Sequence, residues 1–127
     1  MARDVRQLIV WQLADELQDE TLKLIRLPRW ETDFKLRDET DKTASQIKRN
    51  IAEGFRRPTH ADFARFLEYS FSSLGELRTL FDEGFKKRYA TAAQLQPARA
   101  LCFRLERALR GLIRYLRRND PPPSWNH

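Results

Sequence analysis

The chain has 127 residues, of which 41% are hydrophobic and 33% are charged, with 24 Lys and Arg against 18 Asp and Glu. This length fits one domain that can bury a core without disulfides or metals. The single cysteine, Cys102, excludes an intrachain disulfide, and two histidines add no zinc-binding spacing. No apolar stretch approaches the roughly 20 residues of a membrane span and no signal-like segment opens the sequence, so we expect a cytosolic protein. We also expect no cofactor.

The basic residues concentrate in the last third of the sequence. Residues 1–85 contain 14 basic and 16 acidic side chains, a net charge of −2, whereas residues 86–127 contain 10 basic and 2 acidic ones, a net charge of +8. An asymmetry of this size predicts either a polyanionic partner or an acidic protein surface as the binding partner.

Apolar residues recur every three or four positions in four segments. This spacing predicts amphipathic helices over about 5–26, 35–55, 60–85 and 92–119. The expected core faces are Val10, Leu13, Ala14, Leu17, Thr21, Leu24 and Ile25; Leu36, Thr40, Ala44, Ile47, Ile51 and Phe55; Phe63, Phe66, Leu67, Ser70, Leu74, Leu77 and Phe81; and Leu101, Leu105, Ala108, Leu112 and Leu116.

Local signals place the ends of these helices. The segment 27–30, which contains Pro28, ends the first helix, and Gly54 followed by Pro58 ends the second. Gly84 is suited to cap the C-terminus of the third helix.

The starts of the last two helices carry capping boxes. Thr59 with Asp62, and Thr91 with Gln94, can each satisfy backbone N–H groups that lack a partner in the first turn. Pro97 falls in the expected second turn of the last helix, so we expect it to kink the helix or delay its start.

Four helices joined by short connections predict an all-α fold, an antiparallel up-down four-helix bundle over residues 1–119. The Pro-rich residues 120–127 are expected to be a tail outside the bundle. The sequence shows no strand alternation and no glycine-rich phosphate loop, which excludes enzyme folds built on parallel sheets.

Motifs in the second and third helices resemble a known family. Asn50-Ile51-Ala52-Glu53-Gly54-Phe55, followed by Arg65-Phe66-Leu67 and Ser73-Leu74-Gly75-Glu76-Leu77, is similar to the four-helix bundle proteins encoded in intervening sequences of bacterial 23S ribosomal RNA genes. Trp11 and Ala14 match as well. The resemblance implies a small homo-oligomer, typically a pentameric ring, with no recognised catalytic residues. The architecture is also similar to the accessory variability determinant proteins of diversity-generating retroelements, which are basic pentameric bundles that bind nucleic acid and a reverse transcriptase.

The sequence departs from the family in one place. Gln46-Ile47-Lys48-Arg49 stands where the family usually has a Ser-Ile-Pro-Ser run, so two cations replace small residues and the proline is absent.

The last helix carries a stripe of arginines opposite its apolar face. Because guanidinium groups along one side repel one another unless an anion lies against them, and because their planar fork suits phosphate, we expect the stripe to bind RNA or DNA through its phosphates. Phe103 lies in the same sector and could stack a base. The expected nucleic-acid-binding residues are Arg99, Arg104, Arg107, Arg110, Arg114, Arg117 and Arg118.

Two other interpretations of the stripe remain open: the arginines are solvated, or they pair with an acidic edge of a neighbouring subunit in a head-to-tail ring. The acidic residues of the first third that could form this edge are Asp15, Glu16, Asp19, Glu20, Glu31, Asp33, Asp38, Glu39 and Asp41.

A second apolar strip lies on the first helix, away from its core face, and consists of Leu8, Trp11 and Leu22. On the third helix, Ser72 and Gly75 face away from the core and would allow another helix to approach closely. These five residues predict a subunit interface. The alternative is that Trp11 covers the edge of the core within one chain.

The remaining polar candidates are interpreted structurally. His60 lies in a loop and His127 ends the sequence, so neither supplies the inward Glu-x-x-His pairs of a di-iron bundle, and we expect no metal. Asn50 and Glu53 are expected to join helices by hydrogen bonds. Cys102 has no activating histidine and is expected to be a buried apolar residue.

These observations favour a non-enzymatic, homo-oligomeric bundle that binds nucleic acid without base specificity. The alternative is a protein-only assembly or adaptor module that scaffolds a partner, such as a nucleic-acid-processing enzyme.

Overall fold

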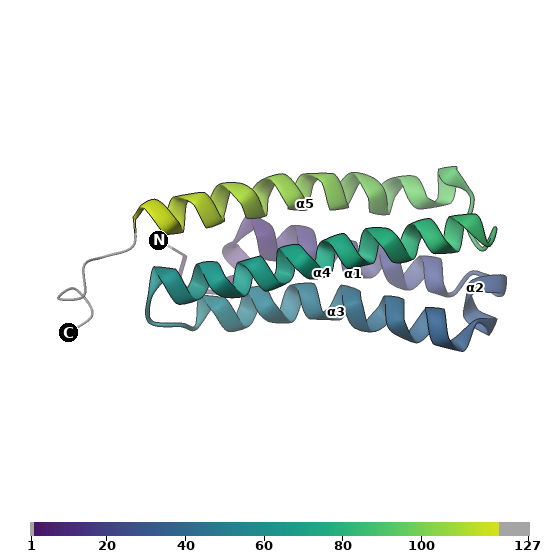
Figure 1. Cartoon of the computed structure of the whole chain (residues 1–127), viewed down its shortest axis with the longest axis horizontal. Helices are drawn as coiled ribbons and strands as arrows, with labels where there is room; N and C mark the ends of the chain where they lie inside the picture. The colour runs from purple at the N-terminus through teal and green to yellow at the C-terminus, as the bar shows by residue number, and fades with distance from the viewer. Residues whose placement is uncertain (1, 120–127) are drawn as a thin grey trace.

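The computed structural model describes residues 2–119, and they form an all-α bundle, as predicted. A 3₁₀ turn, η1 (Val5–Gln7), precedes α1 (Ile9–Ile25), a short α2 (Pro28–Thr32), α3 (Phe34–Phe55), α4 (His60–Lys86) and α5 (Ala92–Arg118). In Figure 1, α1 and α4 run toward the end of the bundle that carries α2, and α3 and α5 run back. Each long helix packs against two neighbours in the order α1, α3, α4, α5. The predicted tail lies outside the described residues.

The predicted first helix is divided into two pieces. Leu8 has an extended backbone, with φ −77° and ψ 134°, so the 3₁₀ turn ends before it and α1 begins after it. The turn is held by a capping box in which the Asp4 side chain accepts a hydrogen bond from the Arg6 N–H and the Gln7 side chain reaches back to the backbone. The prediction of one helix over 5–26 is therefore wrong at its N-terminal end.

Proline and capping residues fix where the other helices begin. Leu27 is extended, as expected for a residue before proline, and Pro28 then opens α2, a helix that the sequence predicted only as a stop. Asp33 caps α3 by accepting from the Leu36 N–H at 3.1 Å. Thr91 and Gln94 form the predicted box, and α5 starts at once and continues through Pro97, so the expected delayed start is wrong.

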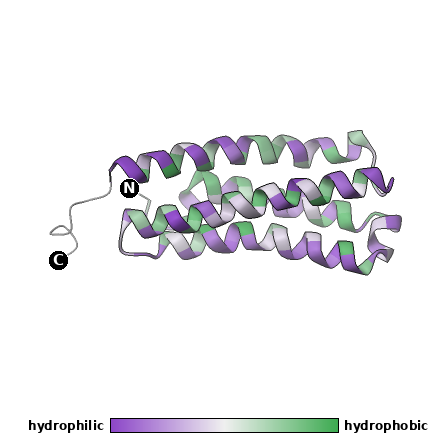
Figure 2. Ribbon diagram, viewed as in Figure 1, coloured by the Kyte–Doolittle hydropathy of each residue, from purple (hydrophilic) through white to green (hydrophobic). Residues whose placement is uncertain are grey.

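The core lies on the inner faces of the four long helices, which are green in Figure 2, whereas their outer faces are largely purple. All seven core positions predicted for α1 are buried. On α5 the buried face is turned relative to the prediction, because Leu95 and Leu109 are fully buried while Ala108 and Leu112 are only half-buried. The aromatic positions predicted nearest the α3–α4 connection, Phe55, Phe63 and Phe66, are also half-buried.

Two glycines serve helix packing instead of the predicted caps. A Cβ on Gly54 would lie 2.8 Å from the Phe66 Cβ, so the absence of a side chain lets α3 and α4 approach. A Cβ on Gly84 would overlap the indole of Trp30, which is fully buried. The cap after α4 is instead made by Arg88, whose φ of 62° places it in the left-handed region, and by the Tyr89 N–H, which bonds to the Gly84 carbonyl at 2.9 Å.

Candidate nucleic-acid interface

The structure divides the seven predicted arginines of α5 into two sets. Three of them pair with carboxylates, because they lie on the flank of α5 that faces α4. Arg99 reaches Asp82 of α4 at 2.8 Å, Arg110 reaches Glu106 at 3.2 Å, and Arg117 bonds to Glu68 of α4. We call Arg99, Arg110 and Arg117 the paired arginines.

The other four are exposed and form no ion pair within residues 2–119. At 100° per residue they fall within a sector of about 80° on the outer face of the helix. They span about 21 Å along the axis at 1.5 Å per residue. We call this set the unpaired arginines, and its members are Arg104, Arg107, Arg114 and Arg118.

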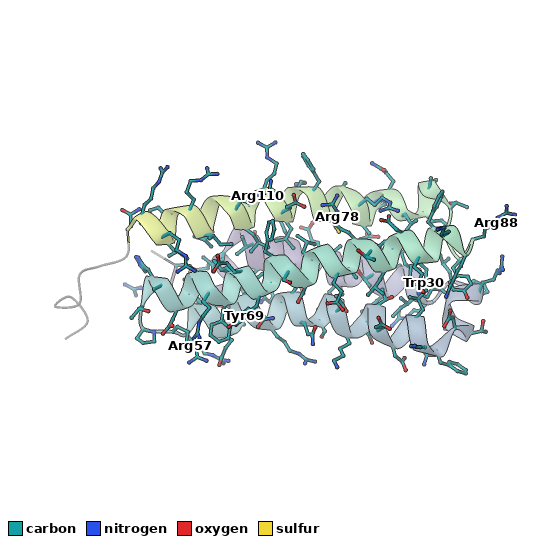
Figure 3. All side chains as sticks on the ribbon, in the orientation of Figure 1. Trp30, Arg57, Tyr69, Arg78, Arg88 and Arg110 are labelled. Atoms are coloured by element: carbon teal, nitrogen blue, oxygen red, sulfur yellow. The ribbon has the colours of Figure 1, made fainter. Side chains whose placement is uncertain are left out.

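Three carboxylates neutralise the paired arginines: Glu106 on α5 itself, and Glu68 and Asp82 on α4. Glu106 is half-buried and is shared by Arg110 and by Arg78 of α4, both labelled in Figure 3. Glu68 and Asp82 add two carboxylates from α4. Sequence reasoning missed them because which face of α4 adjoins α5 depends on how the two helices pack.

The outer face of α5 holds two further features beside the unpaired arginines. Phe103 is 61% exposed, and the Arg107 guanidinium lies 5.8 Å from the centroid of its ring. Gly111 lies between Arg107 and Arg114, and a Cβ built there would meet nothing within 4 Å. A rigid partner can therefore approach the helix backbone closely at this point.

The predicted subunit-interface residues fall into two environments. Leu8, Trp11 and Leu22 are half-buried and pack against the core of their own chain. The ammonium of Lys48 lies 5.2 Å from the centroid of the Trp11 ring and 2.8 Å from an Asp15 oxygen, so one of the two cations that depart from the family pattern ties α3 to α1. This arrangement supports the alternative that Trp11 covers the edge of the core.

Ser72 and Gly75 are exposed on α4, as predicted. A Cβ on Gly75 would meet nothing within 4 Å, so packing inside the chain does not require a glycine there.

Four members of the predicted acidic edge are already engaged inside the chain. Asp15 pairs with Lys48, Glu20 with Lys23, and Asp38 with Arg37. Asp33 contacts Lys87 and accepts a hydrogen bond from the Tyr89 hydroxyl at 2.8 Å. The backbone N–H of Leu36 and this hydroxyl lower the pKa of Asp33 below its usual value. The other five members of the predicted acidic edge, Glu16, Asp19, Glu31, Glu39 and Asp41, form no ion pair within residues 2–119.

Asn50 and Glu53 do not join helices, which corrects that prediction. The Asn50 amide donates to the Gln46 carbonyl one turn earlier in α3 at 3.0 Å. Glu53 accepts from Arg56 and Arg57 at the C-terminal end of the same helix. The hydrogen bond from Arg56 is the main reason that the pKa of Glu53 is lowered.

Other chemistry finds little support among the described residues. Cys102 is buried, as predicted, and burial raises the pKa of its thiol to about 12, so it is not a thiolate nucleophile at neutral pH. Across residues 2–119, no three His, Cys, Asp or Glu side chains come together in a way that could hold a metal ion. None of the helices described there combines the length and apolar character needed to cross a membrane.

The fold and this surface define a class: small all-α bundles with a basic outer face on the last helix. A family model described as 23S rRNA-intervening sequence protein matches residues 6–111. The chain therefore belongs to this family, as its motifs indicate. A comparison with curated proteins finds no match.

Proposed function

We propose that this protein is a non-enzymatic, cytosolic, homo-oligomeric bundle that binds RNA or DNA through the phosphates. One observation carries the proposal: four exposed arginines share the outer face of α5 and, within the described chain, lack a carboxylate. Four like charges along about 21 Å repel one another, and an anionic backbone lying along the helix removes that repulsion. Arginine also donates two parallel hydrogen bonds to a phosphate.

The paired arginines contribute less to such binding. Each already donates to a carboxylate, so a phosphate would have to displace that carboxylate and leave it close to another negative charge. The unpaired arginines have no such competitor, and Gly111 between them allows a nucleic-acid backbone to approach the helix. We therefore assign the phosphate contacts to the unpaired set.

The salt dependence of binding tests this assignment. If each unpaired arginine contacts one phosphate, log K against log salt falls with a slope of about −2.8 on single strands and about −3.6 on duplex. The contact variant replaces Arg107, Arg114 and Arg118 with Gln. It is expected to bind more weakly, and the slope of log K against log salt on single strands should change by about 2.1, from about −2.8 to about −0.7.

A matched control replaces the paired arginines, Arg99, Arg110 and Arg117, with Gln. Both triple variants lose three positive charges, so a non-specific effect of net charge is the same in each. We expect the control to keep most of its affinity and nearly the whole slope, measured by fluorescence anisotropy across a salt series. Equal losses in the two variants would contradict the assignment.

The oligomer is a second part of the proposal, and the pentameric state comes from the family. Gly75 supports an interface on α4, because a glycine inside a helix costs about 1 kcal/mol relative to alanine and, within residues 2–119, a Cβ there would meet nothing within 4 Å. The alternative function, a protein-only assembly, predicts that the contact variant loses subunits. Analytical ultracentrifugation of that variant separates the two: an intact oligomer with weakened binding supports nucleic-acid binding, whereas dissociation places the arginines in a subunit junction.

A further inference from the structure

A groove runs between α4 and α5 beside the unpaired arginines. It is an open, shallow hollow of about 400 Å³, lined by Glu68 and Phe71 of α4 and by Arg110, Ile113 and Arg114 of α5. Arg114 belongs both to the groove and to the unpaired set, so the hollow opens directly onto the surface to which we assign the phosphate contacts.

Phe71 and Ile113 form the apolar lining of the groove. Phe71 and Ile113 are half-buried and pack against the core, which holds them in place. The Arg110 guanidinium lies 5.3 Å from the centroid of the Phe71 ring, so one face of that ring already receives a planar group.

Arg110 is exposed where it covers the ring, and its carboxylate partner does not depend on it. Its side chain is 59% exposed, and its carboxylate partner, Glu106, is fixed independently by Arg78. A planar ligand that displaced Arg110 would therefore gain the face of Phe71, while the guanidinium kept its contact with Glu106 or turned to the solvent.

We propose that this groove receives one unstacked base of a single-stranded nucleic acid, with the adjoining phosphate on Arg114. The inference rests on the proposed function and adds a substrate class to it. A nucleobase is planar and stacks on aromatic rings whatever its identity, and in a duplex the bases are stacked and paired and do not reach such a hollow. Glu68 at the rim bonds to Arg117 through one carboxylate oxygen, and its second oxygen can accept a hydrogen bond from a base N–H group, which favours the base in the groove and the backbone at Arg114.

The test compares a labelled single strand with a blunt duplex of the same length by fluorescence anisotropy. Phe71→Leu keeps an apolar side chain but removes the ring, and it is expected to weaken single-strand binding about fivefold or more while leaving duplex binding unchanged. Phe34→Leu is the matched control, because that ring is 65% exposed but lies on α3, outside the groove and away from the unpaired arginines. It is expected to change neither affinity by more than about twofold.

A second variant covers the case in which Phe71→Leu lowers stability. Ile113→Phe fills the groove and keeps it apolar, and it is expected to remove the preference for single strands. Circular dichroism melts of each variant check that it is folded under the binding conditions.

The outcomes separate the inference from the function beneath it. If the wild type binds both nucleic acids, the contact variant loses binding and Phe71→Leu leaves the ratio of single-strand to duplex affinity unchanged, the inference alone is wrong. If the wild type binds neither, the function and the inference are both wrong. If Phe71→Leu lowers the oligomer mass instead, the groove is covered by another copy of the chain.

Discussion

Gly84→Ala tests how α2 is held to the bundle. A Cβ at this position lies 2.6 Å from Cζ3 and 2.9 Å from Cζ2 of Trp30, and it also overlaps Cη2. The indole is fully buried, and the Tyr89 ring lies 6.2 Å from it, centroid to centroid, so it has little room to move. The added methyl group must therefore push α2 and α4 apart or force Trp30 out of its rotamer.

The size of the effect follows from two opposing contributions. Alanine is more favourable than glycine inside a helix by about 1 kcal/mol. Overpacking a well-filled core costs about 1 to 3 kcal/mol, and three close contacts with one buried ring place this site at the upper end. The net loss in the free energy of unfolding is about 2 kcal/mol. For a domain of this length, that lowers Tm by about 7 °C.

A double-mutant cycle with Trp30→Phe isolates the contact. Phenylalanine lacks the part of the indole that the new Cβ overlaps. Gly84→Ala should therefore change from a loss of about 2 kcal/mol to a gain of about 1 kcal/mol, a coupling of about 3 kcal/mol, because the helix-propensity contribution is the same in both backgrounds. Urea denaturation followed by circular dichroism measures all four variants. If the changes in the free energy of unfolding caused by Gly84→Ala and Trp30→Phe simply add in the double variant, the packing role of Gly84 is refuted.

Three further predictions concern single side chains. Cys102 should resist alkylation at pH 8 in the folded protein and react on unfolding, as followed by mass spectrometry, because burial raises its pKa to about 12. The hydrogen bond to Asp33 raises the pKa of the Tyr89 hydroxyl in the folded state. This hydrogen bond therefore stabilises the fold fully below the unfolded pKa near 10, and the stabilisation is lost as the pH rises through the higher folded pKa. Tyr89→Phe should accordingly show a smaller fall in urea midpoint at alkaline pH than the wild type. Gly75→Ala should raise Tm by about 4 °C if α4 is solvated there, and should instead lower the oligomer mass if another helix packs against it.

Features that depend on a single helix could be predicted from the sequence. The 3.6-residue period placed the whole buried face of α1 correctly, because a helix with one continuous apolar stripe can bury only that face. Thr59 and Thr91 marked the starts of α4 and α5, since a capping side chain bonds to its own first turn and needs no other part of the fold.

Features that depend on two segments far apart could not be predicted in this way. Trp30 lies in a segment that was interpreted as a helix stop, yet it is fully buried because Gly84 leaves space for it on α4. A glycine near the end of a helix usually indicates a cap, and the sequence alone does not distinguish that role from packing. An aromatic residue beside a proline in a short connection is the one signal that could have suggested α2.

The charge of the candidate interface shows the same dependence on packing. Residues 86–127 carry a net charge of +8, but this sum leaves out Glu68 and Asp82, which come from residues 1–85 and lie against α5 through their ion pairs with Arg117 and Arg99. The positive field is therefore concentrated on the outer face of α5 and reduced on the flank beside α4. Because an anion responds to the charge of a face and not of a sequence segment, the two triple arginine variants should differ in salt slope although their net charges are identical.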